Sequence, residues 1–293
     1  MDAQDNKQRM HVGFHVNKTH GCGFGAGNTT TSDTTNDTSK CTLALACQHA
    51  SGEIREYISD ACVQVFITGP QSGKPLDVDG MSKLDVRVYV HGSYVDNPWS
   101  ERTHILRNEL RIADGIGAHG VVVHLGAKAS IRKLDKVFNG LSLTMPKPYI
   151  WLEINSAKAG AGTFETPEKL AALFSDGDDD RVGLCIDTAH LFACGINLGS
   201  REAAETWLRS LQWALPRVHK LVHLNDTSAE LGSGRDVHEN LFHGNLWGAY
   251  KKRKHTSGVA AIVEWCQRHG YDIIVERSSR DSMLDIRVLS ELL

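Results

Sequence analysis

Histidine and acidic residues stand at the ends of six short apolar segments in this chain of 293 residues. The segments are aliphatic, β-branched or aromatic, and each ends in a side chain that can hold a cation or move a proton. Imidazole and carboxylate ligands without cysteine suit Zn²⁺ or Mn²⁺ in an open catalytic site. The six terminal residues are His91, His124, Glu153, Asp187, His223 and Glu276.

Two further clusters extend this set. His190 follows Asp187 by three residues, about one helical turn. Asp236 and His238 lie two residues apart in a loop, so their side chains point to the same side of an extended chain. Together with His190 they would form a separate His–Asp–His site. His15, near the end of the first apolar segment, is expected to support the site from behind the ligands.

The elements that must position these residues are eight strands and seven helices. The apolar segments lack strict alternation, which is typical of strands covered on both faces. Strands are expected at 11–16, 62–67, 86–90, 120–124, 149–153, 182–187, 219–223 and 272–276, and helices at 43–58, 101–117, 129–139, 167–175, 200–213, 258–269 and 281–292. This order predicts the α/β class and a closed (β/α)₈ TIM barrel, in which the carboxyl ends of the strands meet at one face. A doubly wound open sheet is the alternative, and it is weakened because no G-x-G-x-x-G follows the first strand.

A single domain is expected from 11–293, after a hydrophilic tail at 1–10. The stretch at about 25–40 is rich in Gly, Thr, Ser, Asn and Asp, so we expect a polar surface loop inserted after the first strand. Deleting residues 26–39 is expected to change stability little, because the stretch buries almost nothing apolar.

Composition excludes several classes of protein. Hydrophobic residues make up 41% and charged residues 23%, which excludes disorder for most of the chain. No stretch approaches the roughly 20 apolar residues of a membrane span, and no signal peptide is evident, so we expect an intracellular protein that binds no membrane. The net charge of −3 argues against coating nucleic acid by bulk charge. Seven cysteines without C-x-x-C argue against a disulfide framework.

The motifs around the strand ends resemble those of the endonuclease IV family of apurinic/apyrimidinic (AP) endonucleases. The resemblance runs from about residue 11 to the C-terminus, and CIDTAH and HLND…GSGRD-x-HEN are its most specific parts. HGSYVDNPWS and VVVHLGA are most similar to the branch encoded by large cytoplasmic DNA viruses. The matching segments, in family order, are HGSYVDNPWS (91–100), VVVHLGA (121–127), WLEINSAKAG (151–160), VGLCIDTAHLFACGINL (182–198), HLNDTSAELGSGRDVHENLFHG (223–244) and IIVER (273–277).

The resemblance implies a hydrolase of the deoxyribonuclease IV (phage-T4-induced) type that acts in base excision repair. It would hydrolyse the phosphodiester 5′ to an abasic site, leave a 3′-hydroxyl and trim blocked 3′ ends. Its partner would be double-stranded DNA with abasic sites or blocked 3′ ends, bound by a monomer; if the chain is viral, its place would be the host cytoplasm, the nucleus or the virion.

The resemblance also implies three Zn²⁺ ions per chain, with Mn²⁺ as an alternative in part. Glu153 and Glu276 would be essential for catalysis. The first ion would be held by His91, His124 and Glu153, the second by Glu153, Asp187, His223 and Glu276, and the third by His190, Asp236 and His238.

DNA contacts are expected at three places. Tyr94 and Val95 match the family position whose side chains enter the minor groove, although packing of Tyr94 beneath the site is an equal alternative. Asn225 of the HLND motif is expected to touch DNA. A basic run is expected to reach the flank of the duplex, with a solvated face and a nuclear-import signal as alternatives. The run consists of Lys251, Lys252, Arg253 and Lys254.

Two other functions remain open from the sequence. A xylose-isomerase-like sugar isomerase on the same barrel would use the second ligand group around one or two ions, but it gives no reason for the third group. A non-catalytic DNA-binding protein would not need the complete set of ligands.

Overall fold

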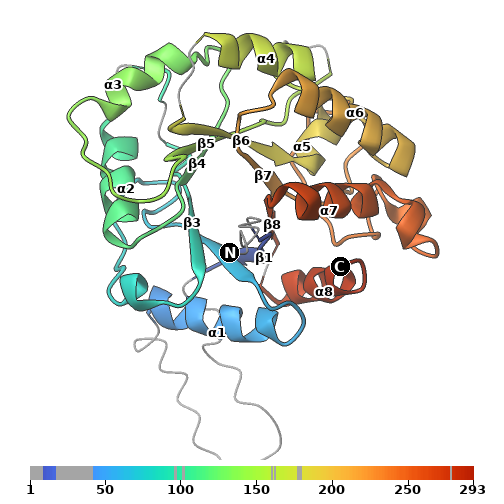
Figure 1. Ribbon diagram of the computed structural model, residues 1–293, viewed down its shortest axis with the longest axis horizontal. Helices are drawn as coiled ribbons and strands as arrows, with labels where there is room; N and C mark the ends of the chain where they lie inside the picture. Colours follow the sequence, from blue (N-terminus) through green and yellow to red (C-terminus); the bar gives the residue numbers. More distant parts are fainter. Residues whose placement is uncertain are drawn as a thin grey trace, which may run out of the picture.

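The computed structural model describes residues 9–17, 42–95, 98–100, 103–159, 161, 163–176, 180–277 and 279–293. Eight parallel strands close into a barrel in chain order, which confirms the predicted TIM barrel (Figure 1). The strands are β1 Val12–Val16, β2 Ala61–Val65, β3 Arg87–His91, β4 Val121–His124, β5 Ile150–Glu153, β6 Val182–Asp187, β7 Lys220–His223 and β8 Asp272–Val275. The predicted polar loop at about 25–40 and most of the predicted tail lie outside the described residues.

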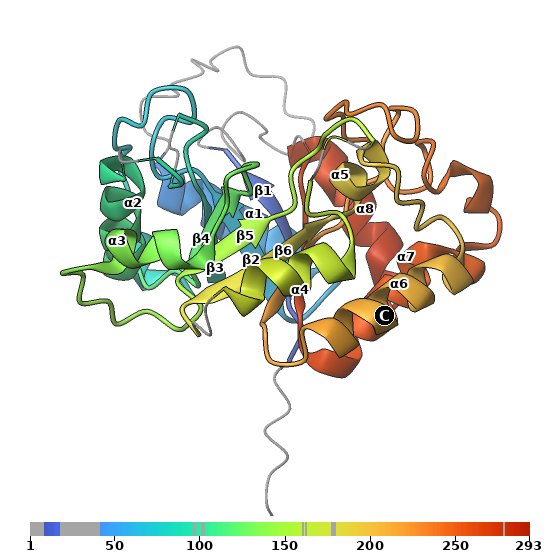
Figure 2. The same ribbon diagram turned by 90° about the horizontal axis from the view of Figure 1, so that it is seen from above.

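Helices cover the outside of the barrel, with α2 and α3 on one flank and α6 and α7 on the opposite flank (Figure 2). None of the helices in these ranges is both long and apolar enough to cross a bilayer. The helices are α1 Leu43–Arg55, α2 His104–Gly115, α3 Asp135–Phe138, α4 Pro167–Ser175, α5 Thr188–Ala193, α6 Arg201–Ala214, α7 Gly258–His269 and α8 Ser279–Ser290. Short 3₁₀ turns occupy Met81–Lys83, Ile131–Leu134, Gly248–Tyr250 and Lys254–Thr256.

Helix α5 is not among the helices expected from the sequence. It is six residues long and all six are buried, so it carries no amphipathic pattern that the sequence could reveal. Asp187 caps its start, because a carboxylate oxygen accepts a hydrogen bond from the backbone N of His190 at 2.8 Å. This cap fixes two of the predicted ligands relative to each other.

The strands send alternate side chains outward to the helices and inward to the barrel axis. The outward side chains join the main apolar core between sheet and helices. Seven inward side chains form a second apolar cluster: Cys62, Tyr89, Val122, Trp151, Cys185, Leu221 and Ile274. Two residues further along the same strands stand Gln64, His91, His124, Glu153, Asp187, His223 and Glu276. An apolar layer therefore supports a polar layer at the carboxyl ends of the strands.

A buried charge network closes the opposite end of the barrel. Asp272 accepts hydrogen bonds from Arg87 Nη1 at 2.6 Å, from the Tyr89 hydroxyl at 2.6 Å and from the backbone N of His11 at 2.7 Å. Burial opposes the charge of this carboxylate, but the hydrogen bonding of His11 and the charge of Arg87 outweigh it and lower the pKa of Asp272. Because the folded pKa lies below the unfolded value, the network stabilises the fold above about pH 4 and loses this contribution as the pH falls.

Asp272→Asn is expected to lower the free energy of unfolding by about 3 kcal/mol at pH 7, because Arg87 would keep a partly buried charge without its partner. Urea denaturation of both proteins measures this difference. The difference should shrink as the pH is lowered below about 4, where the wild-type carboxylate also takes up a proton. A difference that stays constant over that range would show that the charge of Asp272 does not stabilise the fold.

Candidate metal centre

The nine predicted ligands come together at the carboxyl ends of the strands. Six end a strand or follow it directly, His190 lies on α5, and Asp236 and His238 lie in the long connection between β7 and α7. Every one of the nine has a nitrogen–oxygen distance of 3.0 to 3.6 Å to another member. The structure therefore brings all nine side chains together, and their binding of metal stays a prediction.

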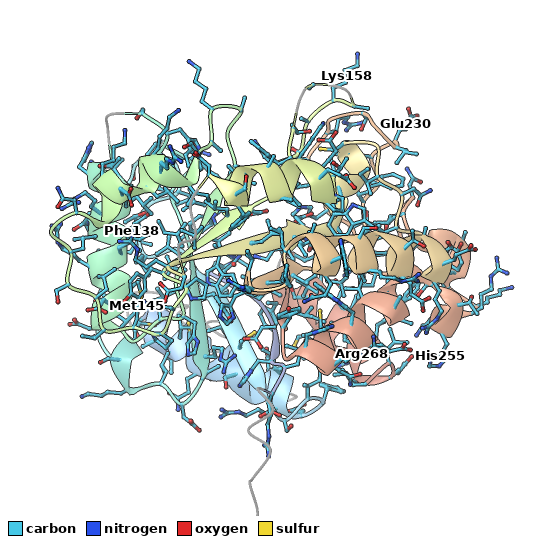
Figure 3. All side chains as sticks on the ribbon, turned by 45° about the horizontal axis from the view of Figure 1, so that its top comes forward. Phe138, Met145, Lys158, Glu230, His255 and Arg268 are labelled. Atoms are coloured by element: carbon cyan, nitrogen blue, oxygen red, sulfur yellow. The ribbon has the colours of Figure 1, made fainter. Side chains whose placement is uncertain are left out.

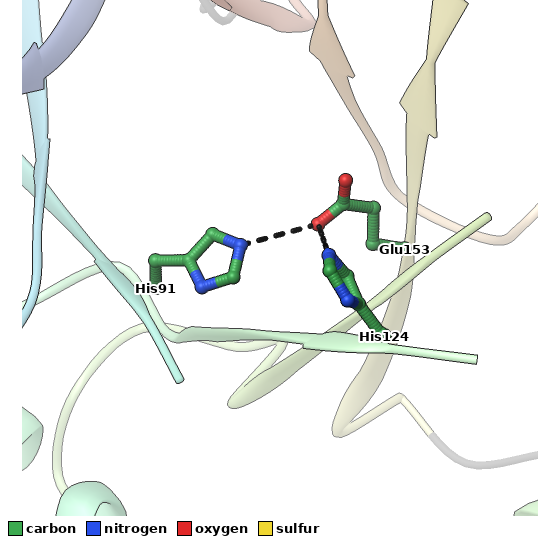
Figure 4. A group of neighbouring side chains, drawn as sticks. All are labelled: His91, His124 and Glu153. Carbon is green, nitrogen blue, oxygen red and sulfur yellow. Dashed lines mark ion pairs between the residues drawn. The ribbon is translucent and has the colours of Figure 1, made fainter. Parts of the chain in front are cut away.

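Glu153 lies between the first two groups and is fully buried. Its Oε2 lies 3.5 Å from Nε2 of His91 and 3.2 Å from Nε2 of His124. Figure 4 shows both rings facing this one oxygen. The other oxygen, Oε1, lies 3.5 Å from Nδ1 of His223. The carboxylate thus faces two groups at once, each through a different oxygen.

Acidic side chains link the remaining ligands. His223 Nδ1 lies 3.0 Å from Oε2 of Glu276. Asp236 Oδ1 lies 3.3 Å from Nε2 of His190 and 3.3 Å from Nε2 of His238. Three sets drawn from the predicted ligands have ligand atoms within 4.8 Å of one another: His91, His124 and Glu153; Glu153, Asp187, His223 and Glu276; and Asp187, His190 and His238. The third set contains Asp187 in place of the predicted Asp236.

Several buried polar atoms at the centre have no hydrogen-bond partner among the described residues. They are both carboxylate oxygens of Glu153, Nδ1 of His223, and Nε2 of His190 and of His238. An unpaired buried polar group costs about 1–3 kcal/mol, and a charged one costs more. These atoms face one another across gaps that divalent cations would bridge, and nitrogen and carboxylate donors are those that Zn²⁺ prefers. The residues therefore fit metal ions.

Three of the histidines are oriented by their second ring nitrogen. Nδ1 of His91 donates to the carbonyl of Gly92 at 2.9 Å, and Nδ1 of His190 donates to the carbonyl of Ile154 at 2.8 Å. Nδ1 of His238 likewise donates to a backbone carbonyl of the β8 end, at 3.1 Å. A carbonyl only accepts, so the proton sits on Nδ1 and Nε2 turns toward the centre. Metal-binding histidines are held in this way in most proteins.

The imidazoles and carboxylates of the site shift each other's pKa. Burial opposes a charge on His124, His190 and His223, but neighbouring acidic groups outweigh it and raise the pKa of all three. Burial would raise the pKa of Glu153, yet His124 and His223 hold it well below its usual range. Protons on the imidazoles and metal cations therefore compete for the same positions.

The thiol of Cys185 also lies within 4.8 Å of ligand atoms of Glu153 and His223. Burial raises the pKa of Cys185 to about 12. Its side chain packs in the apolar cluster of inward side chains beneath the site.

The sequence analysis missed Gln64. Its side chain is fully buried; Nε2 donates to Glu276 Oε1 at 2.6 Å, and Oε1 lies 2.9 Å from His223 Nε2. Nε2 also lies 3.4 Å from Nδ1 of His15, and burial lowers the pKa of His15 to about 4. His15 thus stands behind the ligands, as predicted. The available signal was a lone glutamine in the apolar run CVQVF, on the inward side of the strand.

The loop that carries Asp236 and His238 is tied to the end of β8 and to α8. Arg277 Nη1 donates to the carbonyl of His238. Asp285 on α8 accepts a hydrogen bond from the backbone N of Leu241 at 2.8 Å. These bonds hold a loop without regular secondary structure in the position that the third ligand group requires.

Tyr94 and Val95 form an exposed apolar pair beside the ligands. Their side chains are 53% and 46% exposed. The ring of Tyr94 also packs against the ligands, with centroid distances of 5.3 Å to His91 and 5.7 Å to His124. Tyr94 thus both packs on the site and keeps a free face, and its contact with DNA stays a prediction, as does that of Val95.

The expected DNA contact of Asn225 needs correction. The residue is 1% exposed, so it offers no surface to a nucleic acid. Its Nδ2 donates to Oδ2 of Asp187 at 2.7 Å, and its Oδ1 accepts from the backbone N of Glu276 at 2.8 Å. Asn225 orients ligands from β6 and β8 instead.

The basic run lies at the periphery of the barrel. Lys254 Nζ pairs with Glu291 at 2.6 Å, and the guanidinium of Arg253 lies 5.3 Å from the ring centre of Tyr250. Figure 3 shows His255, the next residue, near the outer edge of the molecule. Lys251, Lys252 and Arg253 are exposed and Lys254 is half-buried, and all four remain predicted contacts to a duplex flank.

Replacing Lys251 and Lys252 by alanine is expected to weaken binding of damaged and undamaged duplex alike, because phosphate contacts carry no lesion information. The slope of log K against log salt should fall by about 0.9 for each phosphate that the variant no longer neutralises, with turnover at saturating DNA unchanged. Fluorescence anisotropy across a salt series measures this. The control variant replaces Arg209 and Arg268, in the groove between α6 and α7, and removes the same charge. Equal salt slopes in both variants would show that the basic run does not contact DNA, and would favour a solvated face or a nuclear-import signal.

The chain is similar in sequence to a family model and to several known proteins. A family model described as xylose isomerase-like TIM barrel matches residues 78–283. A probable AP endonuclease of African swine fever virus (isolate Pig/Kenya/KEN-50/1950) is 36% identical over 240 residues, and the match covers 75% of this chain and 80% of that protein. A probable endonuclease 4 of Mycobacterium bovis (strain BCG / Pasteur 1173P2) is 31% identical over 199 residues, and the match covers 63% of this chain and 76% of that protein. The chain belongs to the endonuclease IV family of AP endonucleases.

A solved structure agrees with this membership of the endonuclease IV family. The crystal structure named AsfvAP:AG superimposes with a TM-score of 0.81 at 28% identity, and the match covers 97% of this chain and 99% of that one. The viral relative is more similar to the chain than the mycobacterial one, 36% against 31% identity. The resemblance to the viral branch of the family is therefore confirmed.

Proposed function

We propose that this member of the endonuclease IV family is a metal-dependent AP endonuclease. It hydrolyses the phosphodiester 5′ to an abasic site in duplex DNA, leaves a 3′-hydroxyl and a 5′-deoxyribose phosphate, and trims blocked 3′ ends. The observation that carries the proposal is the convergence of nine histidine and carboxylate side chains around buried atoms that have no partner among the described residues.

We assign three divalent cations to this centre, Zn²⁺ in the first place and Mn²⁺ as an alternative in part. Glu153 and Asp187 lie between neighbouring groups, which suits shared ligands. The first ion takes His91, His124 and Glu153; the second takes Glu153, Asp187, His223 and Glu276; the third takes His190, Asp236 and His238.

Charge supports a phosphate substrate. The four carboxylates of the centre alone would repel DNA, whereas three divalent cations carry six positive charges and reverse the local sign. A protein of net charge −3 can then bind a polyanion at this one place. Divalent ions in such a site lower the pKa of water and stabilise negative charge on a reacting phosphate.

The side chains of the site hold the metal ligands and the substrate in place, and none of them acts as the nucleophile. His91, His190 and His238 are held by backbone carbonyls, so their Nε2 atoms are fixed before substrate arrives. Tyr94 and Val95 present an apolar surface at the rim, where they would contact the distorted duplex. Extrusion of the abasic nucleotide costs less than that of a normal one, because no base has to leave the stack.

A sugar isomerase on the same barrel would need only the second ligand group. Asp236 lies 3.3 Å from both His190 and His238, and this third group has no part in that alternative. The complete set of ligands likewise argues against a non-catalytic DNA-binding protein.

Incision of a duplex with one tetrahydrofuran abasic analogue tests the proposal. Protein with bound Zn²⁺ should cut 5′ to the analogue and leave an end that a DNA polymerase extends. Chelated protein should not cut, re-added Zn²⁺ should restore cutting, and an undamaged duplex should stay intact. No metal-dependent incision would contradict the proposal, and conversion of a free ketose by the same sample would favour the isomerase.

A further inference from the structure

His223 differs from the other oriented histidines in the group that holds its second nitrogen. His91, His190 and His238 each donate to a backbone carbonyl, which no substitution removes. His223 instead meets a side chain, because its Nε2 lies 2.9 Å from Oε1 of Gln64 on β2. The orientation of His223 therefore depends on a side chain that a substitution can remove.

The amide of Gln64 can take only one of its two orientations. A carboxylate accepts but does not donate, so the atom 2.6 Å from Glu276 Oε1 must be the NH₂ group of Gln64. Oε1 of Gln64 then faces His223, and as an acceptor it requires a proton on His223 Nε2. When His223 is neutral, the lone pair lies on Nδ1, which points toward Glu153 and Glu276.

The same amide also leaves only one carboxylate oxygen of Glu276 facing the centre. Oε1 is engaged by Gln64, whereas Oε2 lies 3.0 Å from Nδ1 of His223, on the side of the centre. Gln64 thus directs one atom of His223 and one atom of Glu276 toward the same space. The residue is fully buried, so water does not compete for these bonds.

We infer that Gln64 is a positioning residue that sets the tautomer of His223 and the free oxygen of Glu276, and thereby determines the affinity of the second metal position. The inference rests on the proposed function, since it assigns a role toward ions that this function requires. An outer residue that orients metal ligands typically contributes about 10- to 100-fold in metal affinity.

Titration of Zn²⁺ against a competing chromogenic chelator tests the inference on metal-stripped, full-length protein. Gln64→Met keeps the length of the side chain but can neither donate nor accept as the amide does. It should bind one Zn²⁺ about 10- to 100-fold more weakly than wild type and the other two with unchanged affinity. Gln64→Leu is the second variant, and circular dichroism establishes which of the two is folded.

Tyr89→Phe is the matched control. It removes a buried hydrogen bond to Asp272 in the layer below and should lower stability without changing Zn²⁺ affinity. Wild-type affinity at all positions in a folded Gln64 variant would overturn the inference and leave the proposed function standing. Equal weakening in Tyr89→Phe would overturn it as well, because the effect would then reflect stability alone. Wild-type protein that binds no Zn²⁺ would overturn both.

Discussion

Glu153→Gln is expected to lower incision by about a thousandfold or more, equivalent to about 4 kcal/mol of transition-state stabilisation. Glu153 lies between two ligand groups and uses a different oxygen toward each. An amide has the same size but lacks the charge, and it can offer only one oxygen. Glu276→Gln should act in the same direction, because Glu276 belongs to the second group. Single-turnover incision of a duplex with a tetrahydrofuran analogue measures the loss.

The fold should survive this change, because glutamine fills the same volume and the apolar core between sheet and helices is left intact. Circular dichroism and urea denaturation check that the variant is folded. Glu165→Gln is the control, since Glu165 is also buried and pairs with Lys169 at 2.6 Å but lies outside the ligand groups. Near-normal incision by Glu153→Gln would show that the ligand assignment is wrong.

Removing the metal is expected to lower stability by several kcal/mol, and by more at pH 8 than at pH 6. Each occupied position adds about 2.7 kcal/mol when free metal exceeds the dissociation constant a hundredfold. The raised pKa values of His124, His190 and His223 describe protonated imidazoles paired with carboxylates in the metal-free protein. The protonated imidazoles stabilise the metal-free fold fully below the unfolded histidine pKa near 6.5. This stabilisation is lost as the pH rises through the raised pKa values of the folded state.

Metal affinity, in contrast, rises with pH, because the cations must displace protons from the same imidazoles. The lowered pKa of Glu153 matters only at more acidic pH, since its contribution is lost below about pH 4.5. Thermal unfolding with and without a chelator at pH 6 and pH 8 gives the two differences. A difference in melting temperature that is equal at the two pH values, or larger at pH 6, would contradict this coupling of protons and metal.

Much of the barrel could be predicted because its strands carry a strong apolar signal. The strands predicted at 182–187 and 149–153 lie within one residue of β6 and β5, since buried parallel strands read as short aliphatic runs. Helix α5 could not be predicted, because a buried helix of six residues has neither the length nor the periodicity that marks a helix.

The ligands could be predicted for a different physical reason. In a parallel barrel the carboxyl end of every strand reaches the same face, so an acid or histidine at each end must meet the others. Gln64 could not be predicted in this way, because it lies inside β2 and its amide is not a usual metal ligand. The prediction for Asn225 is wrong because a motif gives the residue type but not its burial, which depends on packing between β6, β7 and β8.

A crystal structure of the protein as purified, with an anomalous difference map at the zinc absorption edge, tests the central claim most directly. The account predicts three peaks at the carboxyl ends of the strands. Each should lie about 2.0–2.2 Å from histidine nitrogen or carboxylate oxygen atoms of its own group. A single peak, peaks away from these nine side chains, or no peak in crystals grown with Zn²⁺ would contradict it.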